Sequence, residues 1–252
     1  MSARAIITGS TLRSFAAITG LPRTHAEQRA TLGSSMIREV RSFALGPLGT
    51  NMIQAAQRWQ QRMGITGKAS IIPCDTPEHS LALAVAERKD DILALFWSCA
   101  VYVHLNDLFF RNVDCLPFQF QQVMPLDELQ LACRPELAEQ AAEAVPIGWR
   151  VSTHPSPAPL LADLPVEIIL ANSNAAAAEA SACGRSEACI TTETARLRYG
   201  LTKLFSFGCP EMVFFGGVTE KGAALLRSAF AGLARSSTAF NTSTMKRRNN
   251  HE

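Results

Sequence analysis

Short apolar runs alternate along the chain with small or polar junctions and with stretches of helical periodicity. After residue 41 this order recurs, as where the run 166–171 is followed by polar residues and then by an alanine-rich stretch. A short apolar run bounded by turn residues is typical of a buried strand, and apolar positions three or four apart are typical of a helix. Strands that alternate with helices predict an α/β fold.

The first strand-to-helix junction shows the pattern clearly. A strand over 42–45 leads through the turn Gly46–Thr50 into a helix from Met52 to Met63, which Gly64 ends. Thr50 is expected to cap this helix, because a threonine at the N-cap accepts a hydrogen bond from the first turn.

Three further junctions follow the same order. At the second, Ser156 is the expected cap and Pro157 the first residue of a helix, since proline suits that position. The remaining predicted elements are strands over 149–152, 166–171 and 187–190, and helices over 76–88, 135–144, 175–182 and 193–199.

Length and charge limit the possible functions. At about 150 residues per domain, 252 residues make one large domain or two small lobes. The net charge of +2 does not indicate binding to a polyanion such as a nucleic acid. No apolar run approaches the roughly 20 residues that a membrane span needs. A hydrophobic content of 47% excludes a disordered chain. We therefore expect a soluble globular protein with neither a nucleic-acid nor a membrane partner.

The cysteines and the two ends of the chain add three expectations. The seven cysteines are scattered without a Cys-x-x-Cys pair, which predicts reduced thiols in the cytoplasm and no metal site. Residues 1–37 are interpreted as an N-terminal extension, although the acid-free stretch 1–26 is also similar to an organellar transit peptide. Residues 219–252 are expected to form a polar tail, disordered from Ala234 on, whose basic cluster 246–248 is too short to indicate a partner.

The residue identities at several junctions are more informative than their pattern of apolar and polar positions. The segments 46–50, 172–177 and 190–201 resemble, in order and spacing, the catalytic domain of prephenate dehydratases over roughly residues 42–217. A closer resemblance is to the branch of that family that decarboxylates prephenate without forming an aromatic ring. The segments that carry it are Asp75-Thr76, Leu131–Glu136, Ser152–Pro157, Asn172-Ser173, Glu193–Leu201 and Phe215-Gly216.

The chain also departs from the dehydratases. Their Thr-Arg-Phe motif, whose threonine helps to expel the ring hydroxyl, is replaced by the stretch 210–215. Their Glu-Asn-Ser segment is replaced by 95–100, and Met52 stands where they have a serine. Only a short polar segment follows the domain, so feedback through a regulatory domain is not expected.

The resemblance implies a fold, a site and an assembly. The fold is a two-lobed α/β domain of the type II periplasmic-binding-protein architecture, with residues 38–122 and 209–218 in lobe one and 123–208 in lobe two. The site lies in the cleft between the lobes, needs no cofactor and takes a small dicarboxylate. The family is also expected to form homodimers.

Two sets of side chains are candidates for the chemistry. Both carboxylates of prephenate need hydrogen-bond donors, and helix N-termini at strand-to-helix turns supply them. The expected substrate-binding residues are Gly49, Thr50, Asn51, Ser156, Asn172, Ser173 and Asn174. The expected catalytic residues are His154, His104 and Glu211, as proton donors or carboxylate partners.

Each catalytic candidate has an alternative interpretation. His154 could simply fix its turn by a backbone hydrogen bond, whereas His104 and Glu211 could lie on the solvated surface. Phe96, Trp97 and Tyr102 could line a cleft wall, but core is the default for aromatic residues in an apolar run.

The leading functional hypothesis is a lyase that decarboxylates prephenate to a dihydro-4-hydroxyphenylpyruvate, for specialised-metabolite or non-proteinogenic amino-acid biosynthesis. Three alternatives stay open: a divergent dehydratase that makes phenylpyruvate, a lyase that acts on a different acid, and a carboxylate-binding protein without catalysis.

Overall fold

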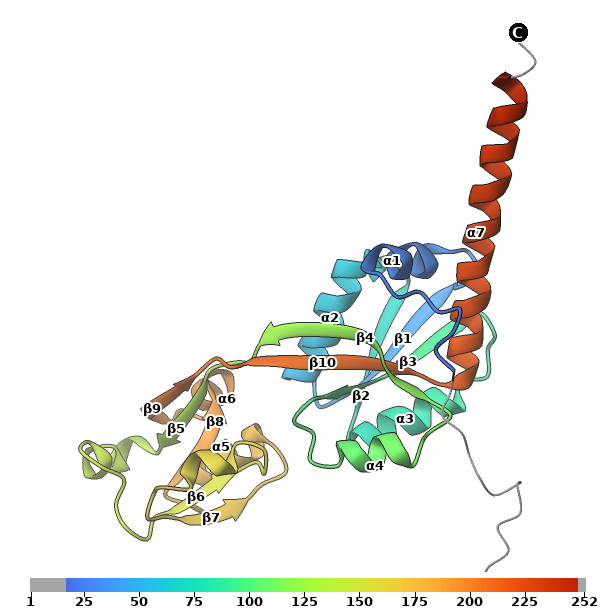
Figure 1. Cartoon of the computed structure of the whole chain (residues 1–252). Helices are drawn as coiled ribbons and strands as arrows, with labels where there is room; N and C mark the ends of the chain where they lie inside the picture. The colour runs from blue at the N-terminus through green and yellow to red at the C-terminus, as the bar shows by residue number, and fades with distance from the viewer. Residues whose placement is uncertain (1–16, 249–252) are drawn as a thin grey trace, which may run out of the picture. The chain divides into compact units, whose positions relative to one another are not determined.

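The chain folds into two compact units. The computed structural model describes residues 17–248, with side chains up to residue 235 (Figure 1). Unit 1 contains the described residues up to Ala100, then His104–Gln122 and the residues from Val213 on, and unit 2 contains Val101–Val103 and Val123–Met212. Unit 1 is therefore built from segments that unit 2 separates in the sequence. No helix within residues 17–248 combines the length and the apolar character that a membrane crossing needs.

Unit 1 is built on a five-stranded mixed sheet in the order β2-β1-β3-β10-β4. Strand β1 pairs in parallel with β2 and with β3, and β10 pairs antiparallel with β3. The strands are β1 Glu39–Leu45, β2 Ala69–Cys74, β3 Ile92–Cys99, β4 Leu116–Pro125 and β10 Glu211–Val218. The helices are α1 His25–Gly33, α2 Asn51–Met63, α3 Pro77–Ala86, α4 Leu105–Phe110 and α7 Glu220–Arg248, with a 3-10 turn η1 at Thr66–Lys68.

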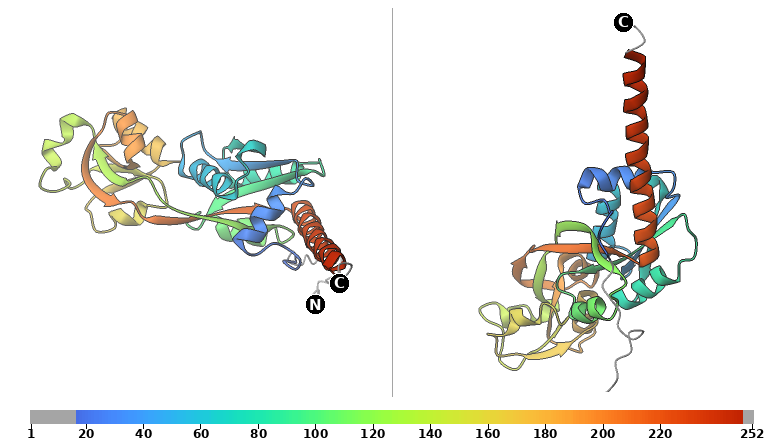
Figure 2. Two further views of the ribbon diagram at one scale, coloured as in Figure 1. Left: turned by 90° about the horizontal axis from the view of Figure 1, so that it is seen from above. Right: turned by 45° about the vertical axis from the view of Figure 1, so that its right-hand side comes forward.

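Helices cover both faces of this sheet. Phe96 and Trp97 are neighbours in β3, so their side chains point to opposite faces. Trp97 packs edge-on against Trp59 of α2 with ring centroids 5.6 Å apart, whereas Phe96 packs with Leu81 of α3 and Leu108 of α4. Helix α7 lies beside α1 (Figure 2). Phe96 and Trp97 are thus core residues, 2% and 0% exposed, and form no cleft wall.

Unit 2 has a five-stranded mixed sheet of its own, in the order β7-β6-β8-β5-β9. Strand β6 pairs in parallel with β7 and β8, and β5 pairs antiparallel with β8 and β9. The strands are β5 Leu129–Cys133, β6 Arg150–Thr153, β7 Glu167–Leu170, β8 Ala188–Thr192 and β9 Thr202–Gly208. The helices are α5 Asn174–Ala182 and α6 Glu193–Arg198, with 3-10 turns η2 Pro135–Leu137, η3 Glu139–Ala141 and η4 Ala158–Leu161.

The two sheets share one strand order. In each, three parallel strands lie in the order second, first, third, counted along the chain, and an antiparallel strand takes the fourth place. This is the strand order of the type II periplasmic-binding-protein architecture. The expected fold class, a two-lobed α/β fold, is therefore confirmed.

Two predicted helices are wrong. Within residues 135–144 only the 3-10 turns η2 and η3 form, and Ala138 and Ala141, three residues apart, pack against the core of unit 2. The helix expected after Pro157 is only the 3-10 turn η4, and Ser156 does not cap it. Pro165 limits how far a helix could continue, since the residue before a proline avoids helical angles.

The structure also differs from the expected ends of the chain. Where the sequence pattern indicates a polar tail over 219–252, α7 occupies Glu220–Arg248, and Ala223, Leu226 and Ala229 are buried at helical spacing. The basic cluster 246–248 lies outside the residues whose side chains are described. Of the expected N-terminal extension, residues 1–16 lie outside the described residues, whereas Leu32 and Ile37 are buried in unit 1.

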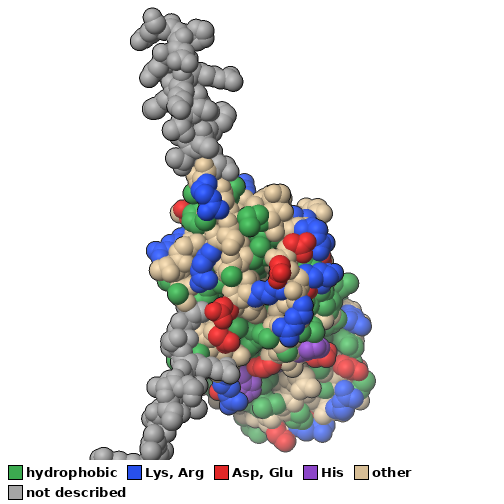
Figure 3. Space-filling view, turned by 90° about the vertical axis from the view of Figure 1, so that its right-hand side faces the viewer, with side chains coloured by type: hydrophobic (Ala, Val, Ile, Leu, Met, Phe, Trp, Pro, Cys, Tyr) green, Lys and Arg blue, Asp and Glu red, His purple; other side chains and the backbone are tan. Residues whose placement is uncertain are grey.

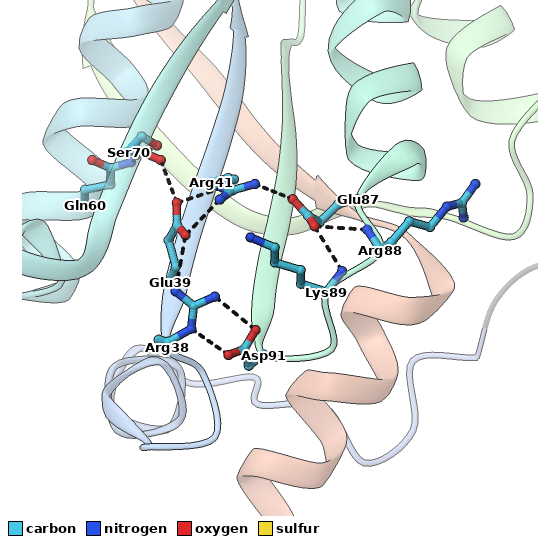
Figure 4. A network of polar contacts seen from close by, with 9 residues as sticks. All are labelled: Arg38, Glu39, Arg41, Gln60, Ser70, Glu87, Arg88, Lys89 and Asp91. Carbon is cyan, nitrogen blue, oxygen red and sulfur yellow. Dashed lines mark hydrogen bonds and ion pairs between the residues drawn. The ribbon is translucent and has the colours of Figure 1, made fainter.

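On the face shown in Figure 3, charged side chains of both signs are interspersed. An ion-pair network surrounds the start of β1 and β3 in unit 1 (Figure 4). Arg41 donates to Glu39 at 2.7 Å and to Glu87 at 2.6 Å, and Arg38 donates to Asp91 at 2.6 Å. The network ties the first residues of β1 to the loop before β3, at the end of the sheet opposite to the loops described next.

Candidate functional site

In unit 1, the loops that follow β1, β2 and β3 meet at one edge of the sheet. These strands are parallel, so their carboxyl ends share that edge, where ligands of open α/β sheets usually bind. The backbone N–H of Gly46 donates to the carbonyl of Cys74 at 2.8 Å, which joins the first two loops.

Glycine shapes the turn before α2. Gly46 and Gly49 have φ angles of 102° and 93°, which other residues rarely adopt. A Cβ on Gly46 would also lie 2.6 Å from Cγ2 of Thr50. The expected residues Gly49, Thr50 and Asn51 therefore lie together at the turn between β1 and α2.

Thr50 occupies the N-cap position but does not cap with its side chain. Its hydroxyl donates to the carbonyl of Leu45 at 3.1 Å, so no side chain caps α2, and its first turn contains no acidic residue. The next helix differs, because the hydroxyl of Thr76 accepts from the N–H of His79 at 3.0 Å. The backbone N–H groups at the start of α2 thus carry a partial positive charge that no side chain of the turn neutralises.

In unit 2, the loops after β6 and β7 likewise meet at one edge. The N–H of Ala171 donates to the carbonyl of Thr153 at 2.8 Å, and the hydroxyl of Thr191 donates to the carbonyl of Asn174 at 2.9 Å. The expected residues His154, Ser156, Asn172 and Ser173 lie on these two loops, and Asn174 is the first residue of α5.

His154 is half-buried and fixes its own turn. Its Nδ1 accepts a hydrogen bond from the N–H of Ser156 at 3.2 Å, which assigns the ring proton to Nε2. Burial lowers the pKa of His154, so its imidazole is neutral at pH 7. The hydroxyl of Ser156 donates to the carbonyl of Val101 at 3.2 Å. That contact could not be anticipated, because Val101 lies 55 positions earlier in the chain.

In the loop after β7, the side chain of Ser173 acts as the helix cap that the sequence predicts. The hydroxyl of Ser173 accepts from the N–H of Ala176 at 3.0 Å and caps α5 as expected. Asn172 and Ser173 are exposed. The side-chain oxygen of Asn174 is buried and has no hydrogen-bond partner among the described residues.

The other catalytic candidates lie elsewhere. His104 is exposed at the start of α4 in unit 1, and Glu211 is exposed at the start of β10. His104 and His154 belong to different units. Within residues 17–248, no group of three or more His, Cys, Asp or Glu side chains could hold a metal ion.

All seven cysteines are free thiols. Four of them are buried, and burial raises the pKa of Cys115 to about 11 and that of Cys189 to about 12. These two thiols are therefore protonated at pH 7 and are not nucleophiles.

Comparisons with known proteins give no family. No family profile and no curated protein matches the chain. The solved structures similar to it include GqqA, described as a novel type of quorum quenching acylase, with 16% identity and a TM-score of 0.41, covering 72% of this chain and 64% of that one. The chain thus spans less than two thirds of GqqA.

Two further similar structures are matched over most of their length. The Bordetella pertussis BvgS periplasmic VFT2 domain has 15% identity and a TM-score of 0.47, covering 84% of this chain and 98% of that one. R. palustris Rpa4515 with adipate has 14% identity and a TM-score of 0.48, covering 77% and 82%. The chain is accordingly assigned to no family.

Proposed function

We propose that this chain binds prephenate and decarboxylates it without aromatisation. The observation that carries the proposal is the start of α2, where a glycine turn at the carboxyl edge of a parallel sheet leads into a helix without a capping side chain or an acid. Such a helix N-terminus attracts a carboxylate. The family resemblance of the segments 46–50, 152–157 and 172–177 points to the same loops and supplies the identity of the substrate.

In unit 2, the groups that we assign to the substrate are His154 and the residues Asn172–Asn174, which lead into α5. The neutral His154 has its Nε2–H to donate and is a poor acid, so we assign it the role of a carboxylate partner rather than a proton donor. The exposed amide of Asn172 is a further donor.

The reaction breaks the bond between the ring and its carboxylate. Carbon dioxide leaves, the electron pair moves into the ring diene, and a ring carbon takes up a proton while the ring hydroxyl stays. The aromatising alternative expels that hydroxyl, which requires an acid beside it. The stretch 210–215 has no threonine where dehydratases have theirs, which favours retention of the hydroxyl.

Turnover is the direct test. Purified protein mixed with prephenate at about pH 8 is expected to release carbon dioxide and to form a product whose mass retains the ring oxygen, with no phenylpyruvate in the ultraviolet spectrum. Phenylpyruvate with loss of water would make the protein a dehydratase. Absence of turnover, with the buffer-only rate subtracted, would refute catalysis on prephenate and direct the search to other acids.

A second prediction tests whether a substrate carboxylate binds at the start of α2. Asn51→Asp adds a carboxylate at the first helical position, which stabilises the helix but repels a substrate carboxylate, so KM for prephenate should rise about fivefold while Tm does not fall. Gln57→Glu adds the same charge on the exposed side of α2 and should leave KM unchanged. Equal KM values for both variants would show that no carboxylate binds at this turn.

One observation favours a second candidate, a carboxylate-binding protein without catalysis. Two of the three expected catalytic residues, His104 and Glu211, are exposed, so neither is enclosed in a site that excludes water. Thermal stabilisation by prephenate without carbon dioxide release would identify this function. We also propose a cytoplasmic location, which the free thiols favour, and the homodimer stays a prediction.

A further inference from the structure

An open pocket of about 280 Å³ lies in unit 2 beside α5. Ser152 of β6 and Ile169 of β7, which are paired across the two strands, line it on the sheet side. Ala176 and Ala180 line it on the helix side, and Arg185, from the loop before β8, lines it as well. Leu170, Ala171 and Asn172, from the end of β7 and the loop before α5, complete the lining.

The sequence explains why space remains there. Ala176 and Ala180 are four residues apart, so both methyl groups lie on the same side of α5. Neither side chain reaches far enough to cover Ile169, which is only partly buried. Strand β7 is the edge strand of the sheet, so no neighbouring strand adds side chains beyond it.

Two polar side chains in this pocket lack partners. Ser152 is 1% exposed, and its hydroxyl has no hydrogen-bond partner among the described residues. A buried hydroxyl without a partner is costly, so it points to a ligand or water that supplies the missing hydrogen bond.

Arg185 is exposed, and its guanidinium forms neither an ion pair nor a hydrogen bond with the described residues. Three other arginines of unit 2 are paired, Arg134 with Glu136, Arg150 with Glu187 and Arg196 with Glu193, and Arg198 lies over the ring of Tyr199. Arg185 is thus a cation without an ion pair that lines a pocket in which the Ser152 hydroxyl is a donor without a partner.

We propose that this pocket binds a small organic monocarboxylate. The fork of the Arg185 guanidinium matches a carboxylate, and the Ser152 hydroxyl donates a further hydrogen bond. The methyl groups of Ala176 and Ala180 and the side chain of Ile169 cover the apolar body of the acid. The volume is nearly twice the roughly 150 Å³ that accommodates benzene, which suits an acid the size of benzoate or 4-methylpentanoate.

This site shares Asn172 with the loop assigned to prephenate, but none of its other lining residues is assigned to that substrate. Among the residues that line the pocket, Arg185 is the one cation, which suits one negative charge rather than the two of prephenate. Asn172 lines the pocket and also belongs to the loop assigned to prephenate, so the test must distinguish the two ligands.

Calorimetric titration of the full chain with 4-methylpentanoate and with benzoate tests the proposal. At least one acid should bind with a stoichiometry of one per chain, and neutral 4-methylpentanamide should not. Arg185→Gln should weaken binding at least tenfold, because it removes the charged partner. Arg198→Gln, the matched control in the same unit, should not change it, because Arg198 lies over the ring of Tyr199. Absence of saturable binding, or equal binding by the amide or by Arg185→Gln, would overturn the proposal.

A second variant gives effects of opposite sign. Ser152→Ala should raise the Tm of the ligand-free protein, because it removes an unsatisfied buried hydroxyl, and should weaken binding of the acid. A lower Tm would mean that the hydroxyl has a partner, which contradicts the proposal.

Competition with prephenate tests whether the two ligands occupy the same pocket. Arg185→Gln should keep the turnover of prephenate, and excess prephenate should not displace the monocarboxylate. Displacement one for one would make this pocket the prephenate site and refute a separate one. Absence of prephenate turnover in the parent protein would refute the proposed reaction and leave the monocarboxylate titration as the test of the pocket.

Discussion

Replacing Gly217 by alanine is expected to destabilise unit 1 by about 3 kcal/mol, at the upper end of the usual cost of overpacking a core. Gly217 of β10 lies directly opposite Phe96 of β3. A Cβ at this position would stand 2.3–2.7 Å from three atoms of the Phe96 ring, closer than carbon atoms can approach. The ring cannot swing away, because Phe96 is 2% exposed within the core.

Urea unfolding followed by tryptophan fluorescence measures this loss, since Trp59 and Trp97 lie in the core of unit 1. Gly33→Ala, at a helical position with nothing within 4 Å of the added methyl group, is the control and should be neutral or slightly stabilising. Phe96→Leu should cost less in the Gly217→Ala background than alone, because the two changes relieve one clash. A Gly217→Ala variant as stable as the Gly33→Ala variant would contradict this expectation, because it would show that the strands shift to accommodate the added methyl group.

Neutralising Glu187 is expected to lower the free energy of unfolding of unit 2 by about 2 kcal/mol at pH 7. Glu187 accepts hydrogen bonds from the backbone N–H of Arg150 at 2.8 Å and from its guanidinium at 2.7 and 3.1 Å. The guanidinium, together with this backbone N–H, lowers the pKa of Glu187 from 4.5 to about 2. The Glu187 side chain is 27% exposed, so water screens the ion pair. The expected loss of unfolding free energy is therefore smaller than the pKa shift alone would give.

The sign of this effect makes it dependent on pH. Because the folded pKa is depressed, Glu187 stabilises the fold fully above pH 4.5 and loses this contribution as the pH falls towards 2. The difference between the parent and Glu187→Gln should therefore shrink over that window. Hydrogen exchange in peptides that cover β6 and β8 reports on unit 2 alone. Glu143→Gln, at an exposed position of the same unit, should show no difference at any pH, and a constant gap for Glu187→Gln would contradict the assignment.

Local signals in the sequence were sufficient for much of the fold. At the first and third junctions, an apolar run, a polar turn and a glycine after the last helical residue lie close together, and the strands and helices form there as predicted. The helix that ends at Gly64 does so in the left-handed conformation, with φ of 70°. The turns η2, η3 and η4 were missed because their backbone follows tertiary packing and closely spaced prolines rather than local helix propensity.

The candidate site was less predictable, because a hydroxyl at a helix start has several possible partners. Ser173 caps its helix, whereas Thr50 and Ser156 donate to backbone carbonyls instead. Sequence spacing does not distinguish these outcomes, since they depend on which carbonyl lies nearby in the folded chain. The unpaired state of Arg185 gave no sequence signal either, because Glu187 lies two positions away and pairs with Arg150.

The interruption of unit 1 by unit 2 sets an order of events on the ribosome. All five strands of unit 2 lie within residues 123–212, and this stretch leaves the exit tunnel before the whole of β10. Strand β4, made earlier, has β10 as its neighbour in the sheet and must wait for it, because β10 also separates β4 from β3. Nearly all of unit 2 is therefore synthesised before β10 is complete, and until β10 pairs with β3 the open edge of β3 is a template for mispairing.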